Sequence, residues 1–132
     1  MSVPVLREGR AGVLRGAQCT HFGDPSDGED GGVGAWGFEY RALYPDFPGI
    51  ALPIPFVARY RLKQYQPVKV YNPANHRVVW CFLIDKGPSA ALGRDADLLF
   101  KPWLDLGFGT GEDDPGVVTL DLRIPYLFPA AG

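Results

Sequence analysis

The chain has 132 residues, which is the size of one domain with a single hydrophobic core. Glycine (17 residues) and proline (13 residues) are together roughly twice as frequent as the ~12% of an average protein, which argues against a helical bundle. Hydrophobic residues make up 46% of the chain and aromatic residues 13%, so there is enough apolar material for a core and global disorder is not expected.

The formal net charge of −2 does not supply the positive surface that phosphate backbones require, so we expect no nucleic-acid partner. No apolar run approaches the ~20 residues that span a bilayer, so we expect no membrane insertion. The first ten residues carry charges where a signal peptide has its apolar centre. We therefore expect synthesis in the cytoplasm, with delivery inside a virion or another extracellular assembly as one route to a cell wall.

The chain has two cysteines, Cys19 and Cys81, which could form one disulfide or none. Neither lies in a cysteine and histidine array with the spacing of a metal site. We expect no metal and no other cofactor.

The first expected elements are a short strand and a long loop. The run from Gln18 to Gly23 has the composition of a strand and ends at a Gly-Asp-Pro turn. Residues 24–34 are acidic and glycine-rich without any apolar period, which predicts an exposed loop. The acids of this loop match the spacing of a calcium loop poorly, because the downstream bidentate glutamate is missing.

The middle of the chain is rich in aromatic residues and prolines. Residues 35–50 hold more aromatic side chains than a solvent-exposed loop normally has, so we expect some of them to pack in the core or to bind a ligand. The segment from Ile50 to Phe56 is interrupted by prolines, which predicts an edge strand because proline cannot donate a ladder hydrogen bond.

The second half gives the clearest periodic signals. Pro67–Asn72 and Arg77–Asp85 are joined by an Asn-Pro turn and predict a hairpin. Phe100–Leu106 has near-helical apolar spacing and is followed by Gly107, where a helix would end. Gly116–Ile124 alternates as a strand with one buried face. Several short strands with one helix predict a small β-barrel.

Five segments of the second half follow one another in a specific order. They are Val68-Lys69-Val70-Tyr71-Asn72, Asp85-Lys86-Gly87-Pro88, Arg94-Asp95-Ala96-Asp97-Leu98, Leu106-Gly107 and Gly116-Val117-Val118. This order resembles the double-psi β-barrel of rare lipoprotein A. The resemblance implies a mainly β fold, a single six-stranded double-psi β-barrel with one or two short helices and a long glycine-rich, acidic loop.

The first half adds a resemblance to expansins. Thr20-His21-Phe22-Gly23-Asp24 and Gly34-Ala35-Trp36-Gly37-Phe38 are similar to their first-strand and Gly-Ala-Cys-Gly-Tyr segments, with Trp36 in place of the cysteine. Ala51-Leu52 is similar to the short strand that follows, and the same barrel occurs in a class of endoglucanases. The similarity covers residues 18–124, so we expect an N-terminal arm over 1–16, the barrel domain over 17–125 and a C-terminal tail over 126–132.

Asp97 is the first candidate for catalysis. In the expansin and endoglucanase barrels an aspartate before a leucine acts on the glycosidic oxygen, and the resemblance places that role on Asp97. A carboxylic acid can protonate a leaving oxygen, most effectively where an apolar surround raises its pKa. The alternative is that Asp97 only caps the short helix.

Asp24 is the candidate base, since it stands where the similar endoglucanases carry theirs. It precedes Pro25 and could instead simply begin a turn. Expansins loosen polysaccharide without hydrolysing it, and lytic transglycosylases need only one acid, so a competent Asp97 alone does not decide the mechanism. The glutamate and the Ala-His segment of rare lipoprotein A have no equivalents here, which weakens the case for a transglycosylase.

Three further residues are candidates for the cleft. Asp85 matches an aspartate beside the cleft of rare lipoprotein A, and the alternative is burial with hydrogen bonds to turn amides. Arg94 belongs to the segment that carries Asp97, and we include it among the substrate contacts. His21 on the first strand could be an acid or base, or only a packed strand residue.

Flat aromatic faces with polar groups at the ring edges are typical of sugar sites, so Trp36, Tyr40 and Tyr44 are candidate substrate platforms. They could equally form a core patch or an interface. A stretch free of acids could attract an anionic glycan or could be a solvated face. Its cationic residues are Arg59, Arg61, Lys63, Lys69 and Arg77.

The leading functional hypothesis is a barrel that binds or cleaves cell-wall polysaccharide, either peptidoglycan or a related β-glycan. If the protein is an enzyme, it would be a glycoside hydrolase or a lytic transglycosylase. The alternative is a non-catalytic structural or docking module of a phage tail or a similar envelope-penetrating assembly, whose partners would be other proteins of that assembly. A metabolic enzyme ranks last, since there is no phosphate loop, nucleophile elbow or metal array.

Overall fold

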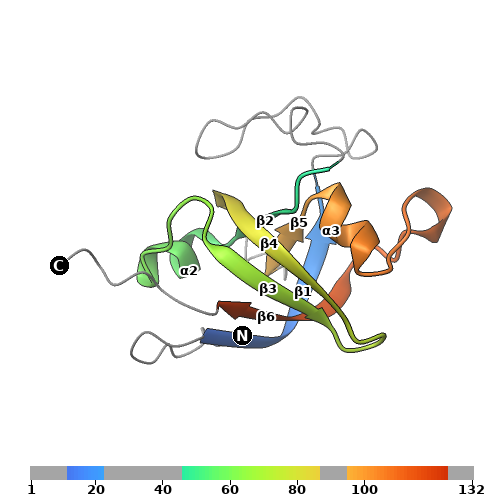
Figure 1. Cartoon of the computed structure of the whole chain (residues 1–132), viewed down its shortest axis with the longest axis horizontal. Coiled ribbons are helices and arrows are strands. Elements are labelled where there is room, and N and C mark those ends of the chain that lie inside the picture. Colours follow the sequence, from blue (N-terminus) through green and yellow to red (C-terminus); the bar gives the residue numbers. More distant parts are fainter. Residues whose placement is uncertain (1–11, 23–45, 87–94, 125–132) are drawn as a thin grey trace.

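The computed structural model of the protein describes residues 12–22, 46–86 and 95–124, and within them six strands close into a barrel (Figure 1). The neighbouring strands follow the order β1-β5-β2-β4-β3-β6. The expected mainly β fold with one closed six-stranded barrel is confirmed. The strands are β1 (Gly12–His21), β2 (Gly49–Leu52), β3 (Pro67–Asn72), β4 (Arg77–Lys86), β5 (Ala96–Leu98) and β6 (Val118–Ile124).

Helical structure is short and lies at the margins of the barrel. The described residues contain two α-helices, α2 (Ile54–Arg59) and α3 (Phe100–Asp105), and one 3₁₀ turn, η3 (Gly111–Asp113). None of the described helices is long and apolar enough to cross a membrane.

The barrel mixes parallel and antiparallel pairing. β1 pairs with β5 in parallel and β2 pairs with β4 in parallel, whereas the other four neighbouring pairs are antiparallel. Parallel partners need long crossover connections, so segments far apart in the chain lie side by side. This topology fits the double-psi barrel that the resemblance implies.

The expected hairpin and final strand are confirmed. Burial alternates strictly along β3 and β6, which gives each of them one buried face, whereas β4 has two consecutive buried residues, Leu83 and Ile84. β3 and β4 pair from Pro67 opposite Phe82 to Asn72 opposite Arg77. In β6 the buried positions alternate with half-buried or exposed ones. These inward side chains meet the fully buried Trp103 of α3 in one core.

The two cysteines lie inside this core on different strands, Cys19 on β1 and Cys81 on β4, and both are free thiols. Burial strongly raises the pKa of each thiol. For Cys19, the nearby carboxylates of Asp95 and Asp97 add to this effect.

The expected edge strand from Ile50 to Phe56 is wrong in two respects. β2 ends at Leu52 and lies between β5 and β4 inside the closed sheet. The following residues form α2, with Pro53 at the N-cap and Pro55 in the first turn. The first helical positions tolerate proline because their amides have no helical acceptor.

β1 is longer than expected, because it begins at Gly12 rather than at Gln18. Its first residues therefore lie within the segment assigned to the arm. The pairing with β6 shifts between Leu14 and Ala17, where Gly16 has a φ of +69°. Figure 1 shows the change of direction of the β1 ribbon along its length, as a β-bulge produces.

Helix α3 ends as expected. Gly107, directly after its last turn, has a φ of +98°, which is the left-handed conformation that glycine adopts most easily. The side-chain amides of Asn72 and Asn75 both donate to the carbonyl of Leu106, each at 2.9 Å. The β3–β4 turn thereby holds α3 against the end of the barrel.

Candidate functional site

The centre of the candidate site is a hydrogen bond between the adjacent strands β1 and β5. Thr20 and Asp97 are register partners in this parallel pair, and the Thr20 hydroxyl donates to Oδ1 of Asp97. Ala96 and Leu98, on either side of Asp97, are fully buried in the core. Because successive side chains of a strand point to opposite faces, the half-buried Asp97 side chain is directed away from the core.

Asp97 does not cap the short helix, so that alternative is wrong. The N-cap of α3 is Leu99, and no side chain makes a capping hydrogen bond there. Asp97 stands two residues earlier, within β5, where its carboxylate reaches across to β1. Its position is therefore set by strand pairing.

His21, the residue after Thr20, has a charged partner that the sequence did not indicate. Its Nε2 lies 2.5 Å from Oδ2 of Asp114, and the exposed fractions of the two side chains are 9% and 23%. The imidazole also packs on Trp103, with ring centroids 4.8 Å apart. Trp103 in turn donates from its indole nitrogen to the carbonyl of Gly109 at 2.9 Å.

Asp114 is thereby fixed next to the candidate site. Partial burial alone would raise its pKa, but the hydrogen bonds with His21 and with the backbone amide of Gly116 outweigh it and lower the pKa of Asp114 below its usual value. The pair joins the end of β1 to the segment that leads into β6.

Asp95 is a second acidic residue that the sequence analysis did not select. It is buried, its Oδ2 accepts from the amide of Gln18 at 2.8 Å, and its own amide donates to the carbonyl of Gln18 at 2.7 Å. This pair of bonds fixes the start of β5 against β1 and so sets the register that brings Asp97 to Thr20.

Asp85 lies in the same sheet as Asp97, separated from it by one strand. Ala51 of β2 is the register partner of Asp97 on one side and of Asp85 on the other. The backbones of the two acids are therefore about 10 Å apart, which is two strand spacings of ~4.8 Å. Asp85 is half-buried and accepts a 2.8 Å hydrogen bond from the amide of Lys86.

Comparison with known proteins supports the fold. No family model matches the chain, and no curated protein matches it. Among solved structures that match, the apo crystal structure of an expansin from Clavibacter michiganensis superposes with a TM-score of 0.57 at 16% sequence identity.

The similarity lies in the fold, which in this chain is the closed six-stranded barrel. The match covers 89% of this chain and 52% of the expansin chain, so this chain spans about half the length of that protein. The finer resemblance to rare lipoprotein A is not confirmed by any comparison.

The remaining expected site residues lie outside the described part of the chain. They are Asp24, Trp36, Tyr40, Tyr44 and Arg94. The same holds for the glycine-rich acidic loop over 24–34. Of the expected site residues, the structure thus describes Asp97, Asp85 and His21. No group of three or more histidine, cysteine, aspartate or glutamate side chains among the described residues could hold a metal ion.

Proposed function

We propose that this barrel binds a β-linked cell-wall polysaccharide, with Asp97 as the acid that contacts the glycosidic oxygen. The observation that carries the proposal is the hydrogen bond from Thr20 to Asp97 on adjacent parallel strands. The expansin-like fold supports the same class of ligand.

Thr20 would act as a positioning residue for this acid. Because its hydroxyl donates to Oδ1, that oxygen of the Asp97 carboxylate is held in place. His21, fixed by Asp114 and Trp103, would border the same sugar from the end of β1.

We propose that the protein binds or loosens the polysaccharide in preference to cleaving it. Hydrolysis by an inverting enzyme needs a second carboxylate about 6.5–9.5 Å from the acid, and a retaining enzyme needs one at about 5–5.5 Å. Asp85 is offset by two strands, and its carboxylate already accepts from a backbone amide. Asp24 remains the candidate second carboxylate for hydrolysis.

The test is to incubate the protein with purified cellulose and with purified peptidoglycan, and to measure both pelleting and released sugar. Asp97→Asn and Thr20→Val are the site variants, and Asp113→Asn, an exposed acid on η3, is the matched control. We expect the parent and the control to pellet with one of the two polymers, and both site variants to bind at least about tenfold more weakly, which corresponds to ~1.4 kcal/mol.

Released products would decide the chemistry. Reducing ends released by the parent but not by Asp97→Asn would establish a hydrolase, and anhydro ends would establish a lytic transglycosylase. If neither polymer is bound or cut, the proposal is wrong, and the docking module of a larger assembly becomes the hypothesis to pursue.

A further inference from the structure

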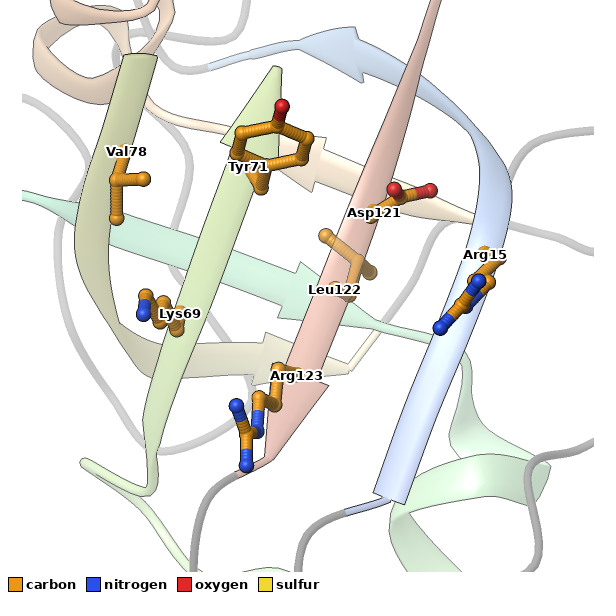
Figure 2. Close-up of a pocket in the computed structure, with 7 residues that line it drawn as sticks. All are labelled: Arg15, Lys69, Tyr71, Val78, Asp121, Leu122 and Arg123. Carbon is orange, nitrogen blue, oxygen red and sulfur yellow. The ribbon is translucent and has the colours of Figure 1, made fainter. Parts of the chain in front are cut away.

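A second surface lies on the outer side of β1, β3 and β6, away from the Thr20–Asp97 hydrogen bond. It is a pocket of about 480 Å³ (Figure 2). This volume falls in the range of ~300–1,000 Å³ that is typical of small-molecule sites. The residues that line it are Arg15, Lys69, Tyr71, Val78, Asp121, Leu122 and Arg123.

Strand register assembles this pocket. Lys69 of β3 is opposite Arg123 of β6, and Tyr71 of β3 is opposite Asp121 of β6. The residues between them, Val70 and Leu122, belong to the buried core. Alternation therefore directs the charged and aromatic side chains to the outer face.

The bulge in β1 supplies the third cation. The register shift between Leu14 and Ala17 leaves Arg15 exposed at the margin of the pocket. The amide of Gly16 donates to Oδ1 of Asp121 at 2.9 Å and so holds the bulge against β6. Figure 2 shows Arg15 on β1 beside Asp121 and Arg123 on β6.

The charge of this pocket is unbalanced. Three cationic side chains surround one carboxylate, which already accepts from a backbone amide. Neither Arg15, Lys69 nor Arg123 forms an ion pair with a described carboxylate. Like charges directly opposite each other on neighbouring strands are destabilising, and Lys69 and Arg123 are such a pair. An anion between them would remove this repulsion.

An apolar wall completes the site. Val78, opposite Tyr71 on β4, is 45% exposed, and the phenol oxygen of Tyr71 lies 2.6 Å from Nδ1 of His76, which orients the ring. Trp80, opposite Lys69 on β4, is 47% exposed and extends the aromatic surface beside the pocket. Exposed ring faces next to cationic groups match a ligand that has both flat apolar faces and negative charges.

We propose that this pocket binds a carboxylate-bearing polysaccharide, with guanidinium groups on the uronate carboxylates and aromatic rings under the sugar faces. Guanidinium and carboxylate groups form paired, charge-assisted hydrogen bonds. A duplex nucleic acid fits less well, because it carries one negative charge per ~1.7 Å of helix axis and this charge density would repel Asp121. That the ligand is a saccharide rests on the proposed function. That the ligand is an anion rests only on the unbalanced positive charge of the pocket.

The test uses calorimetry of the whole protein with oligogalacturonate, with neutral cello-oligosaccharide and with duplex DNA, at low and at high salt. The pocket variant is Lys69→Glu with Arg123→Glu, and the matched control is Arg61→Glu with Lys63→Glu, which has the same net charge at exposed positions outside the pocket. We expect the pocket variant to bind oligogalacturonate at least about tenfold more weakly and the control to lose less than about twofold.

Arg15→Glu, at the exposed bulge, gives the same test if the double variant fails to fold. The proposal is overturned if the parent does not bind oligogalacturonate, if pocket and control variants lose affinity equally, or if DNA binds more tightly. Thr20→Val should leave oligogalacturonate binding unchanged. If Thr20→Val loses binding of the neutral glycan and the pocket variant does not, that loss reports on the Thr20–Asp97 site. The failures of the two proposals can therefore be distinguished.

Discussion

The imidazole of His21 lies 2.5 Å from the carboxylate of Asp114, although 93 residues separate them in the chain. The contact joins the end of β1 to the segment between η3 and β6, one residue away from Thr20 and its bond to Asp97. The geometry beside the proposed acid therefore depends on a residue that belongs to a different part of the sequence.

This pair predicts a loss of stability in acid. Because the pKa of Asp114 is lowered in the folded protein, its contribution is fully present above its ordinary value of 3.8 and disappears as the pH falls through the folded value. Asp114→Asn should lower the free energy of unfolding by about 1 kcal/mol near neutral pH and by less in acid. Thermal unfolding followed between about pH 7 and about pH 3 measures both.

Asp113→Asn, the neighbouring exposed acid, is the control and should change little at any pH. Equal pH profiles for the parent and Asp114→Asn would show that the carboxylate does not contribute through this contact.

Gly107 should be less replaceable than Gly111, although both have positive φ values. A Cβ at Gly107 would stand 2.7 Å from Nδ2 of Asn75, whereas a Cβ at Gly111 would meet nothing within 4 Å. Gly111→Ala should therefore cost only the left-handed strain of about 1–2 kcal/mol. Gly107→Ala should cost more, and urea unfolding of the two variants compares them. Equal losses of unfolding free energy in Gly111→Ala and Gly107→Ala would contradict a close contact between a Cβ at Gly107 and the Asn75 amide.

Asn72 and Asn75 donate to the same carbonyl, that of Leu106, at the same distance of 2.9 Å. Asn72 is buried and also accepts from the amide of Ala74, whereas Asn75 is exposed. Since truncation of a buried side chain loses its hydrogen bonds and also leaves a cavity, Asn72→Ala should destabilise by about 1–3 kcal/mol.

Asn75→Ala is the control for this effect and should cost about 1 kcal/mol or less. Chemical unfolding of both variants gives the comparison. Equal losses would mean that burial of the amide adds nothing.

The thiols of Cys19 and Cys81 should be inert in the folded protein. Both are buried and have strongly raised pKa values, so thiolate is scarce at neutral pH. A thiol reagent added to the native protein should react only as fast as the protein unfolds, and both cysteines should react immediately in denaturant. Rapid reaction of either thiol under native conditions would contradict this burial.

Local sequence patterns predicted part of this fold. The β3–β4 hairpin, β6 and α3 have strong periodicity or a glycine stop, and the structure has them where the pattern places them. The sequence does not predict α2, because Pro53 and Pro55 are compatible both with an edge strand and with the first turn of a helix. The early start of β1 was missed because a bulge breaks the alternation on which strand prediction depends.

The candidate site was less accessible to sequence reasoning. Asp97 was selected from a resemblance, but the helix-cap alternative was wrong and its partner Thr20 follows only from the register of two distant strands. Asp114 stands in an Asp-Pro-Gly segment that has the composition of an ordinary turn. Nothing in that local pattern indicates a partner on the first strand.

The pairing of β1 also bears on how the chain folds. Its two neighbours in the sheet are β5 and β6, and its contacts to them span 77 residues from Thr20 to Asp97 and 105 residues from Gly16 to Asp121. During synthesis β1 therefore has neither of its sheet partners until β5 and β6 have left the ribosome. The β3–β4 hairpin, by contrast, can form as soon as its two strands have been made. Contacts of this range slow folding to about milliseconds to seconds, and until they form, the exposed edges of β1 are open to pairing with other chains.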